Sequence, residues 1–115
     1  MELFDMHSHI LPGVDDGCKT VEDSLKLINI HIKNGVKNIA LTPHYYSNEI
    51  SMDDFIANRQ EAFETLKPFL PDGVSVCLGA EVYVSRYLFN NTDGETLKAG
   101  FNLLFIIMSI SCEIK

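Results

Sequence analysis

The sequence has few cysteines and few basic residues. Its three cysteines, Cys18, Cys77 and Cys112, are widely spaced, and no Cys-x-x-Cys pair occurs. This spacing excludes a zinc ribbon or a thioredoxin-like redox motif, and an odd, low count is typical of a reducing cytoplasm. The chain has only 9 Lys and Arg residues but 16 Asp and Glu residues, which gives a net charge of −7. We therefore expect no nucleic-acid partner, because phosphate-backbone binding relies on clustered Lys and Arg.

Long hydrophobic runs are also scarce. The one strongly apolar stretch, FNLLFIIMSI at 101–110, is about half of the ~20 residues that a membrane-spanning helix needs, and we interpret it as a buried strand. The N-terminus MELFDMHS has no basic segment followed by a long apolar run, so no signal peptide is expected. These absences predict a cytoplasmic chain without a membrane span. Its 115 residues, 46% of them hydrophobic, suit one domain with a folded core.

Strand and helix patterns alternate along the chain. Each of two expected helices opens with a hydroxyl residue followed three positions later by an aspartate, Thr20 with Asp23 and Ser51 with Asp54. Gly35 is the expected stop of the first helix. Strands are expected at four apolar runs, 3–6, 36–42, 74–80 and 101–110. This order predicts an α/β fold with parallel strands, either a small open sheet or the first part of a barrel.

Residues that commonly bind metals follow the first three predicted strands. His7 and His9 follow the first, His44 the second and Glu81 the third. Carboxyl ends of parallel strands lie at one edge of a sheet, so we expect these side chains to converge. Residues i and i+2 of an extended segment point the same way, which lets His7 and His9 reach one ion. Imidazole with carboxylate suits Mn, Fe or Zn.

Three aspartates lie close to the two histidines in the sequence. Asp5 is on the same side as His7 and is expected to orient an imidazole by a hydrogen bond rather than to bind metal. The glycine of PGVDDG permits a tight loop that folds Asp15 or Asp16 towards the site. We interpret Asp15 as a solvated turn residue and Asp16 as a metal ligand.

The other notable polar and aromatic residues are not assigned as metal ligands. His31 falls within a predicted helix and is expected to be a surface or boundary residue. Cys18 adjoins the loop and is interpreted as a bystander thiol. Tyr45 and Tyr46 either line the mouth of the site or pack, and the sequence leaves both readings open. Nothing in the spacing of Arg86 indicates a contact with phosphate.

The motifs DMHSHILPGVDDG, TPHY and GAE, in this order, resemble the bacterial PHP-type protein-tyrosine phosphatases. These are manganese-dependent enzymes of capsule and exopolysaccharide systems, and the similarity covers about the first 90 to 100 residues. The resemblance implies a distorted, TIM-like (β/α)7 barrel with metals at the carboxyl ends of its strands. This chain would be an incomplete barrel, a single partial PHP domain over 1–115 with a divergent tail at about 101–115.

The resemblance also implies ligands and chemistry. His7, His9 and Glu81 would bind one metal, Glu81 would bridge to a second, and Asp16 and His44 would bind a third. The metal would be Mn²⁺, with Fe or Zn as alternatives. It would polarise phosphoryl oxygens and activate water for hydrolysis of phosphotyrosine on proteins, with a tyrosine kinase of polysaccharide export as the partner. No catalytic residue is assigned beyond the ligands.

The family pattern continues past the motifs that this chain contains. A further glutamate, a histidine, an Asp-x-His pair and phosphate-binding arginines follow in the family, whereas this chain has no histidine after His44, and Glu113 is not a confident match. We therefore expect a truncated product with weak or no activity, and self-association through an exposed sheet edge. The alternatives are a non-catalytic metal-binding fragment and another PHP-type phosphoesterase such as a histidinol phosphatase.

Overall fold

Helices and parallel strands alternate in the protein, as the sequence predicts. The computed structural model describes residues 2–83 and 106–109. Its elements in chain order are β1 (Leu3–Asp5), α1 (Val21–Lys33), β2 (Val36–Leu41), β3 (His44–Tyr45), α2 (Met52–Leu66), the 3₁₀ helix η1 (Lys67–Phe69), β4 (Ser75–Leu78), β5 (Ala80–Tyr83) and β6 (Ile106–Ser109). The expected short helix within 84–98 lies outside the described residues, as do Arg86 and most of the predicted strand at 101–110.

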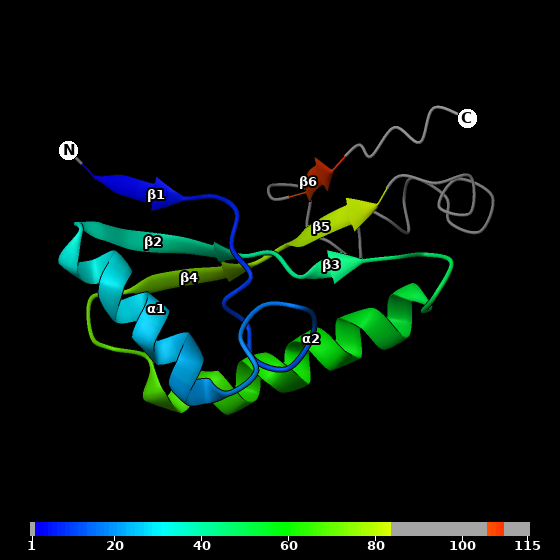
Figure 1. The fold of residues 1–115 in the computed structure, drawn as a ribbon, viewed down its shortest axis with the longest axis horizontal. Coiled ribbons are helices and arrows are strands. Elements are labelled where there is room, and N and C mark those ends of the chain that lie inside the picture. Colours follow the sequence, from blue (N-terminus) through cyan, green and yellow to red (C-terminus); the bar gives the residue numbers. More distant parts are fainter. Residues whose placement is uncertain (1, 84–105, 110–115) are drawn as a thin grey trace.

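The strands form two small sheets, arranged end to end. The first has the order β1-β2-β4 and the second has the order β3-β5-β6, and every pairing is parallel. Figure 1 shows that β2 leads into β3 and that β4 leads into β5, so the second sheet continues from the carboxyl ends of the first. Among the described strands, neither sheet closes on itself.

The strand predicted at 74–80 is wrong in its extent, because Gly79 divides it into β4 and β5. The N–H of Gly79 donates to the carbonyl of Leu41 at 2.8 Å, but its own carbonyl accepts from Nη1 of Arg59 at 2.7 Å. A side chain thus takes the hydrogen bond that a neighbouring strand would have made. Beyond this break, Glu81 pairs in register with His44.

Both helices pack against the same side of the first sheet (Figure 1). Their predicted caps are confirmed: the Thr20 hydroxyl accepts from the N–H of Asp23, and the Ser51 hydroxyl accepts from the N–H of Asp54. The core between helices and sheet is apolar and consists of Ile10, Leu11, Ile28, Ile39, Leu41, Ala62 and Leu66. In the part of the chain that the structure describes, no helix is long and apolar enough to cross a membrane.

Candidate metal centre

The segment that carries His7 and His9 is fixed to β2 through the serine between them. Ser8 donates its N–H to Oγ1 of Thr42 at 3.0 Å and its hydroxyl to the carbonyl of Ala40 at 2.6 Å. The N–H of Thr42 returns a hydrogen bond to the carbonyl of Ser8 at 2.9 Å. Ser8 and Thr42 are both buried. Because side chains alternate along an extended segment, burial of Ser8 turns both histidines to the opposite side.

A single carboxylate oxygen, Oε2 of Glu81, lies at the centre of the three predicted histidines. It is 3.0 Å from Nε2 of His7, 2.9 Å from Nε2 of His9 and 3.3 Å from Nδ1 of His44. Nε2 of His7 is also 3.2 Å from Nε2 of His9. The structure therefore brings together the four side chains that follow the first three predicted strands.

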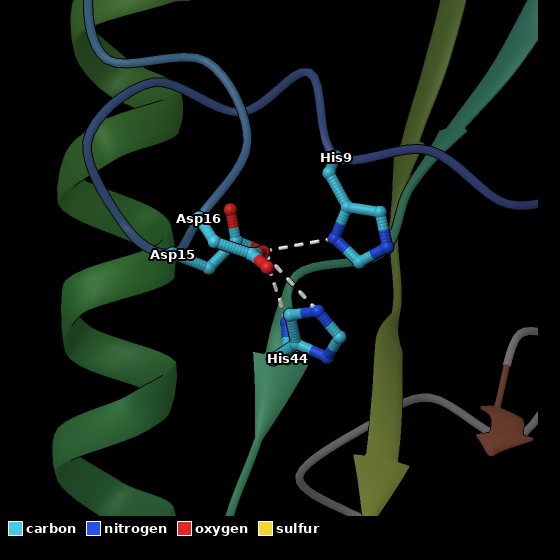
Figure 2. A group of neighbouring side chains, drawn as sticks. All are labelled: His9, Asp15, Asp16 and His44. Atoms are coloured by element: carbon cyan, nitrogen blue, oxygen red, sulfur yellow. Dashed lines mark hydrogen bonds and ion pairs between the residues drawn. The ribbon is translucent and has the colours of Figure 1, made fainter.

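The loop after β1 brings both aspartates of the DDG motif to this cluster (Figure 2). Oδ2 of Asp15 lies 3.0 Å from Nδ1 of His9 and accepts the N–H of His44 at 3.1 Å. Its other oxygen, Oδ1, accepts the N–H of Gly17 at 2.9 Å. Asp16 is mainly solvated, yet its Oδ1 comes within 3.3 Å of Nε2 of His44.

The interpretation of Asp15 as a solvated turn residue is wrong, since its side chain is only 5% exposed. Burial alone would raise its carboxyl pKa, but hydrogen bonds from His9, Gly17 and His44 hold that pKa below its ordinary value. A carboxylate that accepts from Nδ1 of His9 leaves the Nε2 of that ring available to an ion. The charged form of Asp15 thus orients His9 towards Glu81.

Asp5 does not contact any imidazole of the predicted ligand set. Its Oδ2 lies 2.6 Å from Nε2 of His31, and its Oδ1 accepts the backbone N–H of His7 at 3.0 Å. The expectation that Asp5 orients an imidazole thus applies to His31, a boundary residue of α1, rather than to a predicted ligand. Asp5 acts on His7 through its backbone.

The pKa of Glu81 responds to the histidines around it. Burial alone would raise it, but the hydrogen bond from His7 and the charge of His44 hold the pKa below its ordinary value. Glu81 is therefore a carboxylate over the physiological range. Together with Asp15 and Asp16 it gives the site three acidic groups in a small volume.

The aromatic residues next to the site divide into one that packs and one that lines it. Tyr45 is buried and packs on Phe55, with their ring centroids 4.9 Å apart. Tyr46 stacks on the ring of His44 at 5.5 Å and at an interplanar angle of 22°. Tyr45 therefore packs in the core and Tyr46 lines the site, so each of the two readings from the sequence holds for one tyrosine. Cys18 is buried, and burial raises the pKa of its thiol.

Sequence reasoning missed Arg59, a buried residue of α2 that helps to place Glu81. Its guanidinium binds the carbonyl of Gly79, two residues before Glu81, and lies over the ring of Phe55. A signal was present, because Arg59 lies at helical spacing between Phe55 and the buried Ala62. Burial lowers the pKa of Arg59.

The donor atoms have the composition and spacing that a divalent transition-metal ion accepts. Two groups each have their donor atoms within 4.8 Å of one another: His7, His9 and Glu81, and His9, Asp15, Asp16 and His44. Two ligands at right angles on an ion, each at about 2.1 Å, lie about 3.0 Å apart. The first group matches this spacing closely. Imidazole and carboxylate donors without thiolate fit Mn, Fe or Zn.

Gly17 holds the loop close to His9 and permits no side chain. A Cβ at this position would lie 2.1 Å from the carbonyl oxygen of His9, too close for any real contact. We expect Gly17→Ala to displace Asp15 and Asp16, to destabilise the fold by about 1–3 kcal/mol and to weaken metal binding. Chemical denaturation and calorimetry with Mn²⁺ measure the two effects.

Gly73→Ala is the matched control for Gly17→Ala. Gly73 has a φ of +82° but no atom within 4 Å of an added Cβ. It should cost about 1 kcal/mol of backbone strain and leave metal affinity unchanged. Equal metal affinity of the folded Gly17→Ala variant and the wild type would show that the loop does not position the aspartates for a metal.

The ion pair of His31 and Asp5 makes part of the stability depend on pH. Burial alone would lower the pKa of His31, but hydrogen bonds to the Leu27 carbonyl and Asp5 raise it above its ordinary 6.5. A raised folded pKa contributes stability fully below the unfolded pKa, and this contribution is lost as pH rises through the folded pKa. We therefore expect His31→Gln to lose about 1 kcal/mol or less below pH ~6.5. Its deficit should shrink in alkaline solution, and denaturation series at several pH values measure it.

Comparison with known proteins supplies an independent finding about this chain. The family model described as "Capsular polysaccharide synthesis, CpsB/CapC" matches residues 3–102. The chain is 29% identical over 72 residues to the tyrosine-protein phosphatase YwqE of Bacillus subtilis (strain 168), which is 63% of this chain and 28% of that protein. It is 32% identical over 87 residues to the tyrosine-protein phosphatase CpsB of Streptococcus pneumoniae, covering 70% of this chain and 34% of the relative.

A shorter and stronger similarity links the chain to the tyrosine-protein phosphatase CpsB of Streptococcus agalactiae. There the identity is 50% over 42 residues, which is 36% of this chain and 17% of that protein. The chain thus spans about a third or less of the length of each of these three relatives.

Proposed function

Because the chain belongs to the CpsB/CapC family of capsular polysaccharide synthesis, we propose that it is a metal-dependent protein-tyrosine phosphatase, acting on phosphotyrosine in proteins. One observation carries the proposal: nitrogen atoms of His7, His9 and His44 lie within 3.3 Å of one oxygen of Glu81. The relatives named tyrosine-protein phosphatases support the choice of substrate class.

The proposed metal is Mn²⁺, with Fe or Zn as alternatives, held by the side chains of the cluster. His7, His9 and Glu81 would hold one ion. Glu81 would also contribute to a second ion, and Asp16 and His44 would hold a third. Such ions would polarise the phosphoryl group and activate water.

The charges of the described residues favour this dependence on metal. Glu81, Asp15 and Asp16 place three carboxylates in the site, and three acidic groups repel a phosphate dianion. Bound cations would reverse the sign of that field. The ring of Tyr46, stacked on His44 at the edge of the cluster, offers a flat apolar surface to an aromatic leaving group.

We also propose the larger context from the family. The two open parallel sheets would be the first part of a PHP-type (β/α)7 barrel, a partial domain over 1–115 with a divergent tail at about 101–115. The substrate would be a tyrosine kinase of polysaccharide export in the cytoplasm. Chains would associate through unpaired sheet edges when the rest of the barrel is missing.

An activity panel tests the proposal. The purified chain is incubated with a phosphotyrosine peptide or with histidinol phosphate, each with Mn²⁺ and with a chelator. We expect hydrolysis of the peptide only with Mn²⁺, and loss of that hydrolysis in Glu81→Gln. Glu61→Gln, on the exposed side of α2, is the matched control and should behave as wild type.

The other outcomes of the panel identify the alternatives. Faster hydrolysis of histidinol phosphate would place the chain with the other PHP-type phosphoesterases. Mn²⁺ binding by calorimetry without hydrolysis of either substrate would identify a non-catalytic metal-binding fragment. Hydrolysis that persists in the chelator would contradict a metal mechanism altogether.

A further inference from the structure

His31 lies in the last turn of α1 and is the one histidine outside the proposed ligand set. Its Nδ1 is 2.8 Å from the carbonyl oxygen of Leu27, and its Nε2 is 2.6 Å from Oδ2 of Asp5. A carbonyl and a carboxylate only accept hydrogen bonds, so both ring nitrogens carry a proton when both bonds form. The carboxyl end of a helix also favours a cation. The surroundings of His31 thus suit an imidazolium.

Asp5 links this imidazolium to the metal centre. One of its oxygens faces His31, and the other accepts the backbone N–H of His7 at 3.0 Å. The side chain of His7 is 43% exposed, and its ring contacts Oε2 of Glu81 and Nε2 of His9. The position from which the ring reaches these two side chains depends on the backbone of His7, which the carboxylate of Asp5 holds just after β1.

We propose that His31 is a positioning residue of the metal centre: by pairing with Asp5, it fixes the backbone of His7 and so presents that imidazole to the ion. The ion pair joins α1 to the loop that carries His7, across 26 residues of sequence. Without the His31 ring, Oδ2 of Asp5 loses this hydrogen-bond donor, and the carboxylate is free to turn towards solvent. The inference rests on the proposed function only in assuming that a divalent ion binds at His7.

The first test uses metal-free protein and measures hydrogen exchange of the His7 amide by NMR. We expect His31→Ala to speed this exchange about 10-fold, because the acceptor on Asp5 is no longer fixed. His31→Gln, whose amide can still donate to Asp5, should remain close to wild type. Ile28→Val loosens the core contact of α1 without touching Asp5 and is the matched control. Unchanged exchange in His31→Ala, or an equal change in Ile28→Val, would overturn the proposal.

The second test measures Mn²⁺ affinity by calorimetry on folded variants. Residues that orient metal ligands typically contribute 10–100-fold to affinity, so we expect His31→Ala to bind about 10-fold more weakly, and His31→Gln to recover most of the loss. In an Asp5→Ala background, His31→Ala should cause no further loss, because its effect passes through Asp5. Wild-type affinity in His31→Ala, or losses that simply add, would contradict a positioning role.

The two tests separate this inference from the proposed function. A wild-type chain that binds no Mn²⁺ would refute the metal-dependent function, whereas exchange of the His7 amide in metal-free protein would still decide whether His31 fixes that backbone. Tight Mn²⁺ binding with no response to His31→Ala would leave the function intact and remove His31 from the site.

Discussion

Replacing His7 and His9 together with alanine is expected to abolish the tightest Mn²⁺ site of the chain. Both rings place Nε2 within 3.0 Å of Oε2 of Glu81, so the double variant keeps only one donor of that group. A site with one carboxylate cannot compete with water for a divalent ion at micromolar concentration. Calorimetry should lose the tightest binding event and keep only the weaker binding at Asp15, Asp16 and His44.

The control for this variant removes charge elsewhere. Glu22 and Lys26 form an exposed i,i+4 pair on α1, and replacing both with glutamine should leave Mn²⁺ binding unchanged. Circular dichroism of each variant shows whether it is folded. Equal Mn²⁺ binding by wild type and the folded His7→Ala, His9→Ala variant would refute the proposed ligand set.

The second large effect concerns catalysis by the 115-residue chain when it is expressed alone. We expect a turnover of phosphotyrosine peptide below ~0.1 s⁻¹, about 10²-fold under the ~10 s⁻¹ of a median enzyme. Phosphoryl transfer depends on positioning and on charge arranged around the phosphate. The 115 residues align with only 28 to 34% of the two phosphatases that match over most of this chain, so they supply only part of the groups that those proteins contain.

The assay for this prediction uses folded protein with excess Mn²⁺. His44→Ala removes the ring that lies between Glu81 and Asp16, and any genuine residual turnover should disappear with it. If wild type turns over near the median value and His44→Ala does not, the cluster around Glu81 alone would be sufficient for catalysis, which would contradict this prediction. Turnover that survives in His44→Ala would point to a contaminating phosphatase.

The parts of the fold that depend on short stretches of sequence could be predicted. The caps at Thr20 and Ser51 were predictable because each hydroxyl bonds an N–H only three residues away. The convergence of His7 with Glu81 followed from a general property of parallel strands, whose carboxyl ends share one edge. Neither inference needed knowledge of a distant side chain.

The errors arose where a distant contact decides the local structure. Gly79 interrupts the predicted third strand because Arg59, from another element, takes its carbonyl. Asp15 and Asp16 are adjacent acids in one loop, and nothing local says which of them faces inward. The close approach of Gly17 to His9 decides which one does, because it brings the Asp15 carboxylate within 3.0 Å of Nδ1 of His9.

The partner of Asp5 was also beyond sequence reasoning. His31 is 26 residues away, and its meeting with Asp5 depends on how α1 packs against the end of β1. The signals at Thr20 and Gly35 correctly predict where α1 begins and ends, but they do not give the direction of one boundary side chain. Because the His31 side chain points to Asp5, which accepts the N–H of His7, its direction links α1 to His7.

Anomalous diffraction from crystals grown with Mn²⁺ measures directly whether the cluster around Glu81 binds divalent metal. We expect at least two peaks, one bounded by His7, His9 and Glu81 and another beside Asp16 and His44. Well-ordered crystals that show those five side chains without a peak among them, or with manganese bound elsewhere in the chain, would contradict that expectation.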